Sequence, residues 1–232
     1  MHSFSACQFS TSAQMSRSNR SFRVSTDLTD TARRSIVTIT LVLYYRKRTM
    51  SNFGFGYGSQ WHLLRYLGYH RQRLNDTIRE QVGGRAIEWL DFPFSEWIDP
   101  LWQDRELVGL EFIANHVHAA LAWTKFWPQQ GTFHNWDAIA KITYDSHEEW
   151  LLVEAKATVG EMRSSCRATN PVSLDTIQAA FDAARPSFGA DAISSTAWLT
   201  PFYQYCNRLT MLHFLQQACQ PIVRARMLFI YF

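Results

Sequence analysis

The feature of this sequence that most restricts its fold is an apolar run over residues 150–157 that carries two opposite charges on one face. The run reads Trp-Leu-Leu-Val-Glu-Ala-Lys-Ala. Side chains alternate between the two faces of a β-strand, so Glu154 and Lys156 project to the same side. Burying a lone charge costs roughly several kcal/mol unless the charge is paired or bound to a metal ion. The fold must therefore satisfy both charges at the end of this strand.

A second predicted strand precedes this run. Residues 135–143 show strand-like alternation, and the polar residues 144–148 provide a turn between the two strands. Asp137 lies near the start of the first strand, and antiparallel pairing of the hairpin brings its carboxylate close to Glu154. The sequence therefore predicts a hairpin with two converging carboxylates.

Two carboxylates at one point repel each other, and a hard divalent cation with oxygen ligands relieves that repulsion. We expect Mg²⁺ or Mn²⁺, bound by Asp137, Glu154 and the carbonyl of Ala155. Lys156 would orient or deprotonate an attacking water and offset charge on a phosphorane-like transition state. These are the parts of a metal-dependent phosphodiesterase. The alternative is an intrastrand pair of Glu154 and Lys156 at a sheet edge, with Asp137 capping a turn and no shared site.

The rest of the pattern predicts an α/β fold with a mixed central sheet flanked by helices. The chain is 47% hydrophobic and 15% aromatic, enough for a packed core. Helical spacing of apolar residues, capping residues and a closing apolar run predict the following elements: a helix from Ser59 to Gly83, a helix from Leu107 to Lys125, a helix capped by Ser173, a helix beginning at Thr200-Pro201 and a strand from Met227 to Phe232.

Residues 1–49 differ in composition from the remainder. They hold eight Arg or Lys against two Asp, which leaves 15 basic and 18 acidic residues in 50–232. We expect 1–49 to be a disordered or non-native extension, with a transit peptide as the alternative, and 50–232 to be a single domain. A chain starting at Met50 should then be as stable as the full chain. The slightly acidic body argues against a broad basic surface for nucleic acid.

Cysteine usage and hydropathy indicate the compartment. The four cysteines form no Cys-x-x-Cys pair, so a zinc ribbon or a disulfide framework is not supported. No apolar run approaches the ~20 residues that span a bilayer. We therefore expect a cytoplasmic protein with no membrane partner.

The hairpin residues resemble the signature of the PD-(D/E)xK, or restriction-endonuclease-like, nuclease superfamily, with Asp137 followed by Glu154-Ala155-Lys156. More narrowly, seven segments are similar to an uncharacterised, mostly bacterial family within that superfamily, over about residues 56–232. They are 58–65 (GSQWHLLR), 89–94 (WLDFPF), 126–128 (FWP), 135–138 (NWDA), 150–157 (WLLVEAKA), 198–201 (WLTP) and 203–209 (YQYCNRL).

The resemblance implies an αβββαβ core and metal-dependent hydrolysis of nucleic acid, DNA or RNA. It also implies an alternative, a catalytically inactive nuclease-like fold that acts as a binding or assembly module. Many members carry a Glu in the first core helix, where this chain has Gln60. The family's chain continues beyond the last strand, so this chain is expected to be a truncated copy.

A last group of polar residues lies on the predicted final helix. Gln204 and Arg208 are four residues apart on one face, with Asn207 beside them. They either line the site and contact a phosphate or serve only surface polarity and helix packing.

Overall fold

A five-stranded mixed sheet forms the centre of the molecule. The computed structural model describes residues 35–40, 58–90, 107–130, 134–219 and 223–232. The strand order is β1-β7-β6-β5-β2. The strands are β1 (Ile36–Thr40), β2 (Ala86–Trp89), β5 (Ala138–Thr143), β6 (Glu148–Lys156) and β7 (Ala225–Tyr231). Strand β7 runs parallel to β1 and β6, whereas β5 is antiparallel to β6 and β2.

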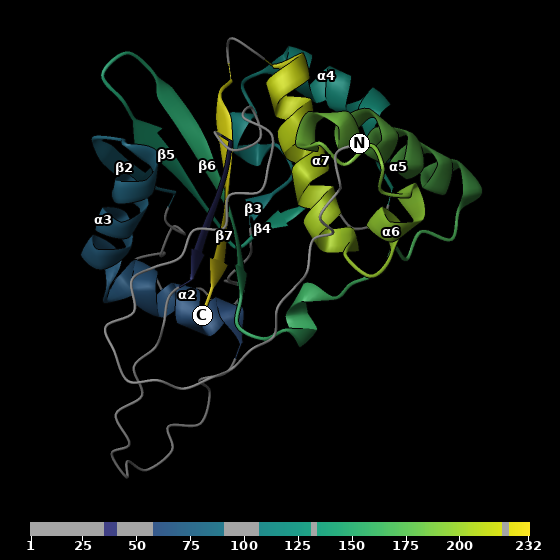
Figure 1. Ribbon diagram of the computed structural model, residues 1–232. Helices are drawn as coiled ribbons and strands as arrows, with labels where there is room; N and C mark the ends of the chain where they lie inside the picture. The colour runs from purple at the N-terminus through teal and green to yellow at the C-terminus, as the bar shows by residue number, and fades with distance from the viewer. Residues whose placement is uncertain (1–34, 41–57, 91–106, 131–133, 220–222) are drawn as a thin grey trace, which may run out of the picture.

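Helices cover both faces of the sheet, and Figure 1 shows the two layers on opposite sides of the strands. One layer holds α2 (Ser59–Gly68) and α3 (Arg71–Val82). The other holds α4 (Val117–Phe126), α5 (Pro171–Ala184), α6 (Ser195–Leu199) and α7 (Tyr203–Ala218). Short 3₁₀ turns are η1 (Glu111–Ile113), η2 (Gly160–Met162) and η3 (Arg185–Phe188). The predicted α/β architecture, a mixed sheet flanked by helices, is confirmed.

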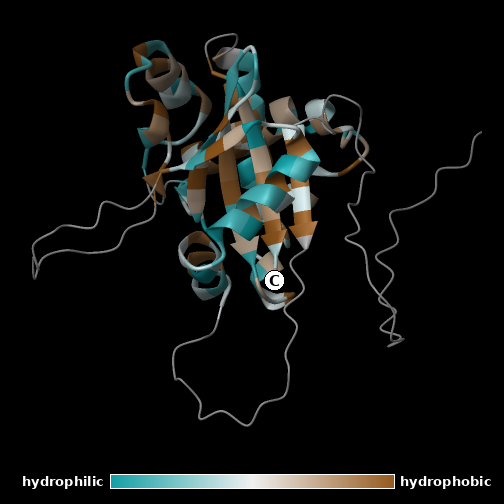
Figure 2. Cartoon of the chain, turned by 90° about the vertical axis from the view of Figure 1, so that its left-hand side faces the viewer, coloured by the Kyte–Doolittle hydropathy of each residue, from teal (hydrophilic) through white to brown (hydrophobic). Residues whose placement is uncertain are grey.

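Alternation along the strands divides the core into two clusters. Leu152 and Phe229 face α4 to α7, whereas Val153 and Leu228 face α2 and α3. Figure 2 shows the strands as hydrophobic bands behind the more hydrophilic helix α3. Because both faces of the central strands are buried, β6 and β7 read as nearly continuous apolar runs. Among the described helices, none is both long and apolar enough to cross a membrane.

The predicted hairpin is present as β5 and β6. Ala138 pairs with Val153 and Thr143 with Glu148, so the turn occupies residues 144–147. The predicted closing strand is present as β7, which lies between β6 and β1. Its apolar side chains are therefore buried on both sides, and its backbone is paired along both edges.

The single helix expected from Ser59 to Gly83 is two helices. The chain turns at Tyr69 and His70, whose backbone amides both donate to the carbonyl of Arg65. The turn lets both α2 and α3 direct apolar side chains at the sheet, which one straight helix over a twisted sheet does not achieve. The predicted end is correct, because Gly83 adopts a left-handed conformation with φ 74°.

The helix expected from Leu107 to Lys125 is α-helical only in its second half, with the single 3₁₀ turn η1 before it. Leu107 and Val108 instead form β3 (Leu107–Val108), which pairs with β4 (Asn135–Trp136) as a two-stranded sheet. Gly109 follows with φ 54°, a left-handed conformation that ends the strand. Tertiary pairing therefore overrides the helical spacing of the apolar residues.

Two helix starts also differ from expectation. Asn170, and not Ser173, caps α5, since its side chain accepts a hydrogen bond from the Val172 amide at 2.9 Å. Helix α7 begins at Tyr203, two residues after the Thr200-Pro201 peptide.

The structure places part of the N-terminal segment in the sheet. Residues 36–40 form β1, which pairs in parallel with β7 over five residues. Val37 and Ile39 are buried beneath α2 and α3. The predicted boundary at Met50 thus leaves out one strand, because five apolar-rich residues in a polar tail gave too short a pattern to predict a strand of the domain. Residues 1–34 and 41–49 lie outside the described residues.

Candidate active site at the end of strand β6

Asp137 links the two strands of the hairpin beyond their last backbone pair. It lies between β4 and β5, and its backbone amide donates to the Val153 carbonyl at 3.2 Å. Its carboxylate Oδ2 accepts a hydrogen bond from the Ala155 amide at 2.6 Å. The carboxylate thus replaces the next backbone acceptor of the ladder, which fixes the side chain against β6.

The carbonyl of Ala155 faces the same region. In a β-strand the N–H and C=O of one residue point to the same side. Because the Ala155 amide is directed at Asp137, its carbonyl is directed toward the end of β5 as well. A carboxylate and a carbonyl oxygen therefore lie at one edge of β6.

Glu154 is buried and paired with two cations. It is 2% exposed, on the sheet face that α7 covers. Its Oε1 accepts a hydrogen bond from Lys156 Nζ, and its Oε2 accepts one from Arg208 Nε at 2.8 Å. The expected common face for Glu154 and Lys156 is therefore observed. The intrastrand pair of the alternative is also observed, but its placement at a sheet edge is wrong, because β6 lies between β5 and β7.

Arg208 is itself buried, at 5% exposure, and comes from α7. Its Nη2 donates to the Asn135 carbonyl, and its Nη1 donates to Asn207 Oδ1 at 3.4 Å. The guanidinium lies 5.0 Å from the ring centroid of Trp136, within cation–π range. Of the two alternatives for Arg208, a role in surface polarity is wrong, because the side chain is buried and bonded to Glu154; a contact with a phosphate stays a prediction.

The four charged groups of the site balance in number. Asp137 and Glu154 supply two negative charges, and Lys156 and Arg208 supply two positive ones. Each oxygen of the buried Glu154 carboxylate therefore has a cationic hydrogen-bond partner.

Two further side chains approach this cluster, and the sequence reasoning missed both. Burial and the charge of Glu154 raise the pKa of Tyr231, which pairs with Lys156 in the β6–β7 ladder. Burial opposes ionisation of Glu161, but hydrogen bonds from Ser59 and from its neighbours, with the charge of Lys156, hold its pKa below the ordinary value. The strand pattern of β7 provided a signal for Tyr231, whereas nothing local pointed to Glu161.

The other predicted auxiliary residues, Gln60, Gln204 and Asn207, differ in their contacts with the site. Gln60 is exposed at the second residue of α2, and in the described part of the chain it makes no hydrogen bond or ion pair with Glu154 or Lys156. The amide of Gln204 donates to Ser164 Oγ at 2.7 Å, which ties the start of α7 to the segment after β6. Asn207 is 8% exposed and supports Arg208 rather than facing solvent.

His134 is buried next to this cluster, where its Nε2 lies 3.3 Å from the carbonyl oxygen of Asn207. Burial, with the charge of Arg208, lowers its pKa to about 3. Its ring contacts the rings of Trp123 and Trp127, with centroids 5.2 and 4.9 Å away. A neutral imidazole adds no further positive charge beside Arg208.

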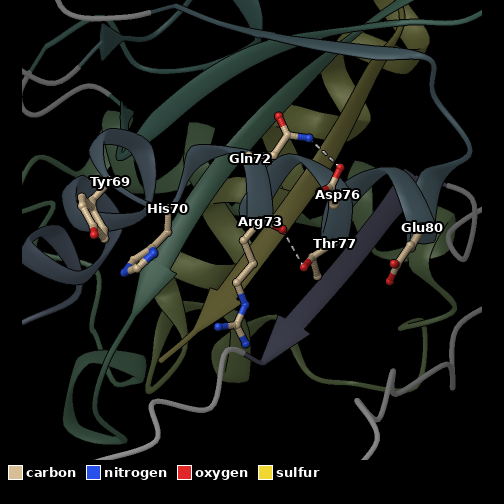
Figure 3. A pocket seen from close by; sticks show the side chains of 7 residues that line it. All are labelled: Tyr69, His70, Gln72, Arg73, Asp76, Thr77 and Glu80. Atoms are coloured by element: carbon tan, nitrogen blue, oxygen red, sulfur yellow. Dashed lines mark hydrogen bonds between the residues drawn. The ribbon is translucent and has the colours of Figure 1, made fainter.

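A groove of about 530 Å³ lies elsewhere, on the outer surface of α3 (Figure 3). Polar and charged side chains line it: Tyr69, His70, Gln72, Arg73, Asp76, Thr77 and Glu80. In the described residues this lining includes none of the predicted site residues. The groove and the candidate site therefore belong to different regions of the molecule.

The oxygen donors of the site are of the type that Mg²⁺ takes. The described residues contain no group of three or more His, Cys, Asp or Glu side chains placed to share a metal ion. Mg²⁺ commonly keeps several waters and binds through only one or two carboxylates. The carboxylates of Asp137 and Glu154 with the Ala155 carbonyl fit that requirement in chemistry, while Lys156 competes for one Glu154 oxygen.

Comparisons with family models, with curated proteins and with solved structures found no match to this chain.

Proposed function

We propose that this protein hydrolyses nucleic-acid phosphodiesters in a Mg²⁺- or Mn²⁺-dependent reaction, with a restriction-endonuclease-like PD-(D/E)xK site. The observation that carries the proposal is the hydrogen bond from the Ala155 amide to Asp137, next to the ion pair of Glu154 with Lys156. The main elements α2/α3, β2, β5, β6, α5 to α7 and β7 also follow the order αβββαβ. That order supports the proposed core.

The chain's own groups have distinct roles in this proposal. Asp137, Glu154 and the Ala155 carbonyl would hold the cation, which when bound polarises a phosphoryl oxygen and acidifies a water. Lys156 Nζ, beside Glu154, orients the attacking water and stabilises charge on the transition state. Burial of the Glu154 carboxylate strengthens these electrostatic interactions by excluding water from one side.

An arginine-bearing segment leaves the site and offers contacts for a phosphate backbone. Arg163 and Arg167 are exposed on the stretch after β6, and neither makes an ion pair within the described residues. Ser164 fixes this stretch to α7, since its carbonyl accepts a hydrogen bond from the Tyr203 amide at 3.2 Å. Positive side chains on a segment that continues from Lys156 favour a polyanionic substrate.

The metal is tested by thermal unfolding with increasing Mn²⁺ or Mg²⁺. A ligand that binds only the native state raises the melting temperature, so the wild type should show a rise. Asp137→Ala should abolish it, while Asp145→Ala, which removes an exposed carboxylate from the hairpin turn, should retain it. A wild type that gains no stability at millimolar metal would contradict the site.

Catalysis is tested with single- and double-stranded DNA and RNA as substrates. Lys156→Ala should retain the metal-dependent rise but lose roughly 10²–10³-fold in cleavage rate, the typical cost of removing one group that stabilises the transition state. Lys141→Ala is the matched control, because Lys141 pairs with the exposed Glu148 in the same hairpin. Equal losses in both variants would argue against a role for Lys156.

The second candidate is a catalytically inactive nuclease-like fold that acts as a binding or assembly module. One observation favours it: Glu154 already has a cationic partner on each oxygen. An inactive module has no need to bind Mg²⁺, so the metal titration separates the two candidates. A metal-dependent rise without cleavage of any of the four substrates would also favour the module.

A further inference from the structure

The guanidinium of Arg208 contacts both segments that carry the site's carboxylates. Nε donates to Glu154 Oε2 at 2.8 Å, and Nη2 donates to the carbonyl of Asn135, two residues before Asp137. The same group lies 5.0 Å from the ring centroid of Trp136, the residue next to Asp137. One side chain on α7 therefore joins β6 to the strand end that holds Asp137.

We propose that Arg208 is a positioning residue that sets the separation of the Asp137 and Glu154 carboxylates for a divalent cation. This inference rests on the proposed function. A planar guanidinium presents several donors in a fixed arrangement, so it can bind a carboxylate and a carbonyl at once and stack on a ring. A lysine ammonium has the same charge but no such fixed geometry. The role therefore depends on the shape of the group as well as on its charge.

The two oxygens of Glu154 have partners of different character. Oε2 pairs with Arg208, whose side chain is 6% exposed and held by three other groups. Oε1 pairs with Lys156, whose side chain is 14% exposed and carries the more flexible stem. Arg208 thus holds the carboxylate in place, and Lys156 is the partner that moves when a cation binds Oε1.

Charge alone predicts the opposite behaviour. A positive group beside a cation site repels the cation, so removing it should tighten metal binding. A positioning role predicts weaker binding when the guanidinium is replaced, even by another cation. The sign of the change in metal affinity therefore separates the two roles.

The test is Mn²⁺ affinity, measured by calorimetry and by the metal-dependent rise in melting temperature, for the wild type and three variants of the full chain. Arg208→Lys keeps the buried charge, Arg208→Met removes it, and Lys156→Met removes the exchangeable cation. We expect Arg208→Lys and Arg208→Met each to bind Mn²⁺ at least tenfold more weakly, and Lys156→Met to bind as tightly as the wild type or more tightly. Circular dichroism without metal establishes whether each variant is folded. If Arg208→Met does not fold, the Mn²⁺ affinity of Arg208→Lys alone decides the test.

The outcomes separate this inference from the proposed function. Wild-type Mn²⁺ affinity in Arg208→Lys, or tighter binding in Arg208→Met, overturns the positioning role and leaves the metal site intact. Absence of Mn²⁺ binding by the wild type overturns the proposed function and the positioning role together. Tenfold weaker binding in Arg208→Lys with unchanged or tighter binding in Lys156→Met supports the inference.

Discussion

Replacing Ile39 by Ala tests whether strand β1 is part of the folded domain. Ile39 is 3% exposed, pairs with Ile230 of β7 and packs in the cluster beneath α2 and α3. Truncating a buried isoleucine to alanine costs about 2–5 kcal/mol, because transfer free energy is lost and a cavity remains. In a domain of this size each kcal/mol lowers the melting temperature by about 2–4 °C. We therefore expect a decrease of about 4–20 °C.

The matched control is Thr38→Ala on the same strand. Thr38 is only partly buried, so its truncation should cost less than about 1 kcal/mol. Both variants are compared with the wild type by thermal and urea unfolding. If Ile39→Ala and Thr38→Ala have equal stability, within about 0.5 kcal/mol of the wild type, then β1 does not contribute to the domain. A chain starting at Met50 should also be less stable than the full chain, because the loss of β1 exposes one edge of β7.

Two further predictions concern charge. The pKa of His134 in the folded protein is lowered to about 3, whereas in the unfolded chain the imidazole has its ordinary pKa of 6.5. Below pH 6.5 the unfolded chain therefore binds a proton that the folded protein does not. The free energy of unfolding should fall by ~3 kcal/mol between pH 6.5 and 4. In urea unfolding at several pH values, His134→Phe should reduce the fall in stability with pH, whereas the control His118→Asn, at an exposed position, should not. The same pH dependence of stability in the wild type and both variants would refute the role of His134. Replacing both Arg163 and Arg167 by Ser should weaken nucleic-acid binding and reduce the slope of log affinity against log salt by about 2. An unchanged slope would show that Arg163 and Arg167 do not contact the nucleic acid.

Three of the five strands of the main sheet, β5, β6 and β7, were predictable from the sequence because their signals are local, whereas β1 and β2 were not predicted. Alternation over residues 135–143 and 150–157, with a polar turn between them, is enough to predict the β5–β6 hairpin and the common face of Glu154 and Lys156. Errors arose where a distant partner decides the local structure. Leu107 has helical spacing but pairs with β4, and β1 is a strand because β7 offers it an edge.

In the candidate site, too, local geometry was predictable from the sequence and distant contacts were not. Asp137 and Glu154 follow from strand geometry, but the pairing of Glu154 with Arg208 joins residues 54 positions apart. Only the packing of α7 on the sheet brings them together, and no periodicity in α7 shows which of its polar residues is buried. Gln204, Asn207 and Arg208 were therefore grouped correctly on one helix, while the contacts that distinguish them were not predictable.

The order of the elements, with Arg208 and β7 after the β5–β6 hairpin, has a consequence for biosynthesis. Strands β5 and β6 can pair as soon as the hairpin leaves the ribosome, since their contacts are local. Glu154 then remains hydrated until α7 and β7, which follow it in the chain, pack against β6. A nascent chain therefore carries the acidic residues of the site before it has the structure that aligns them, so any reactivity of the site would emerge only after α7 and β7 have been synthesised.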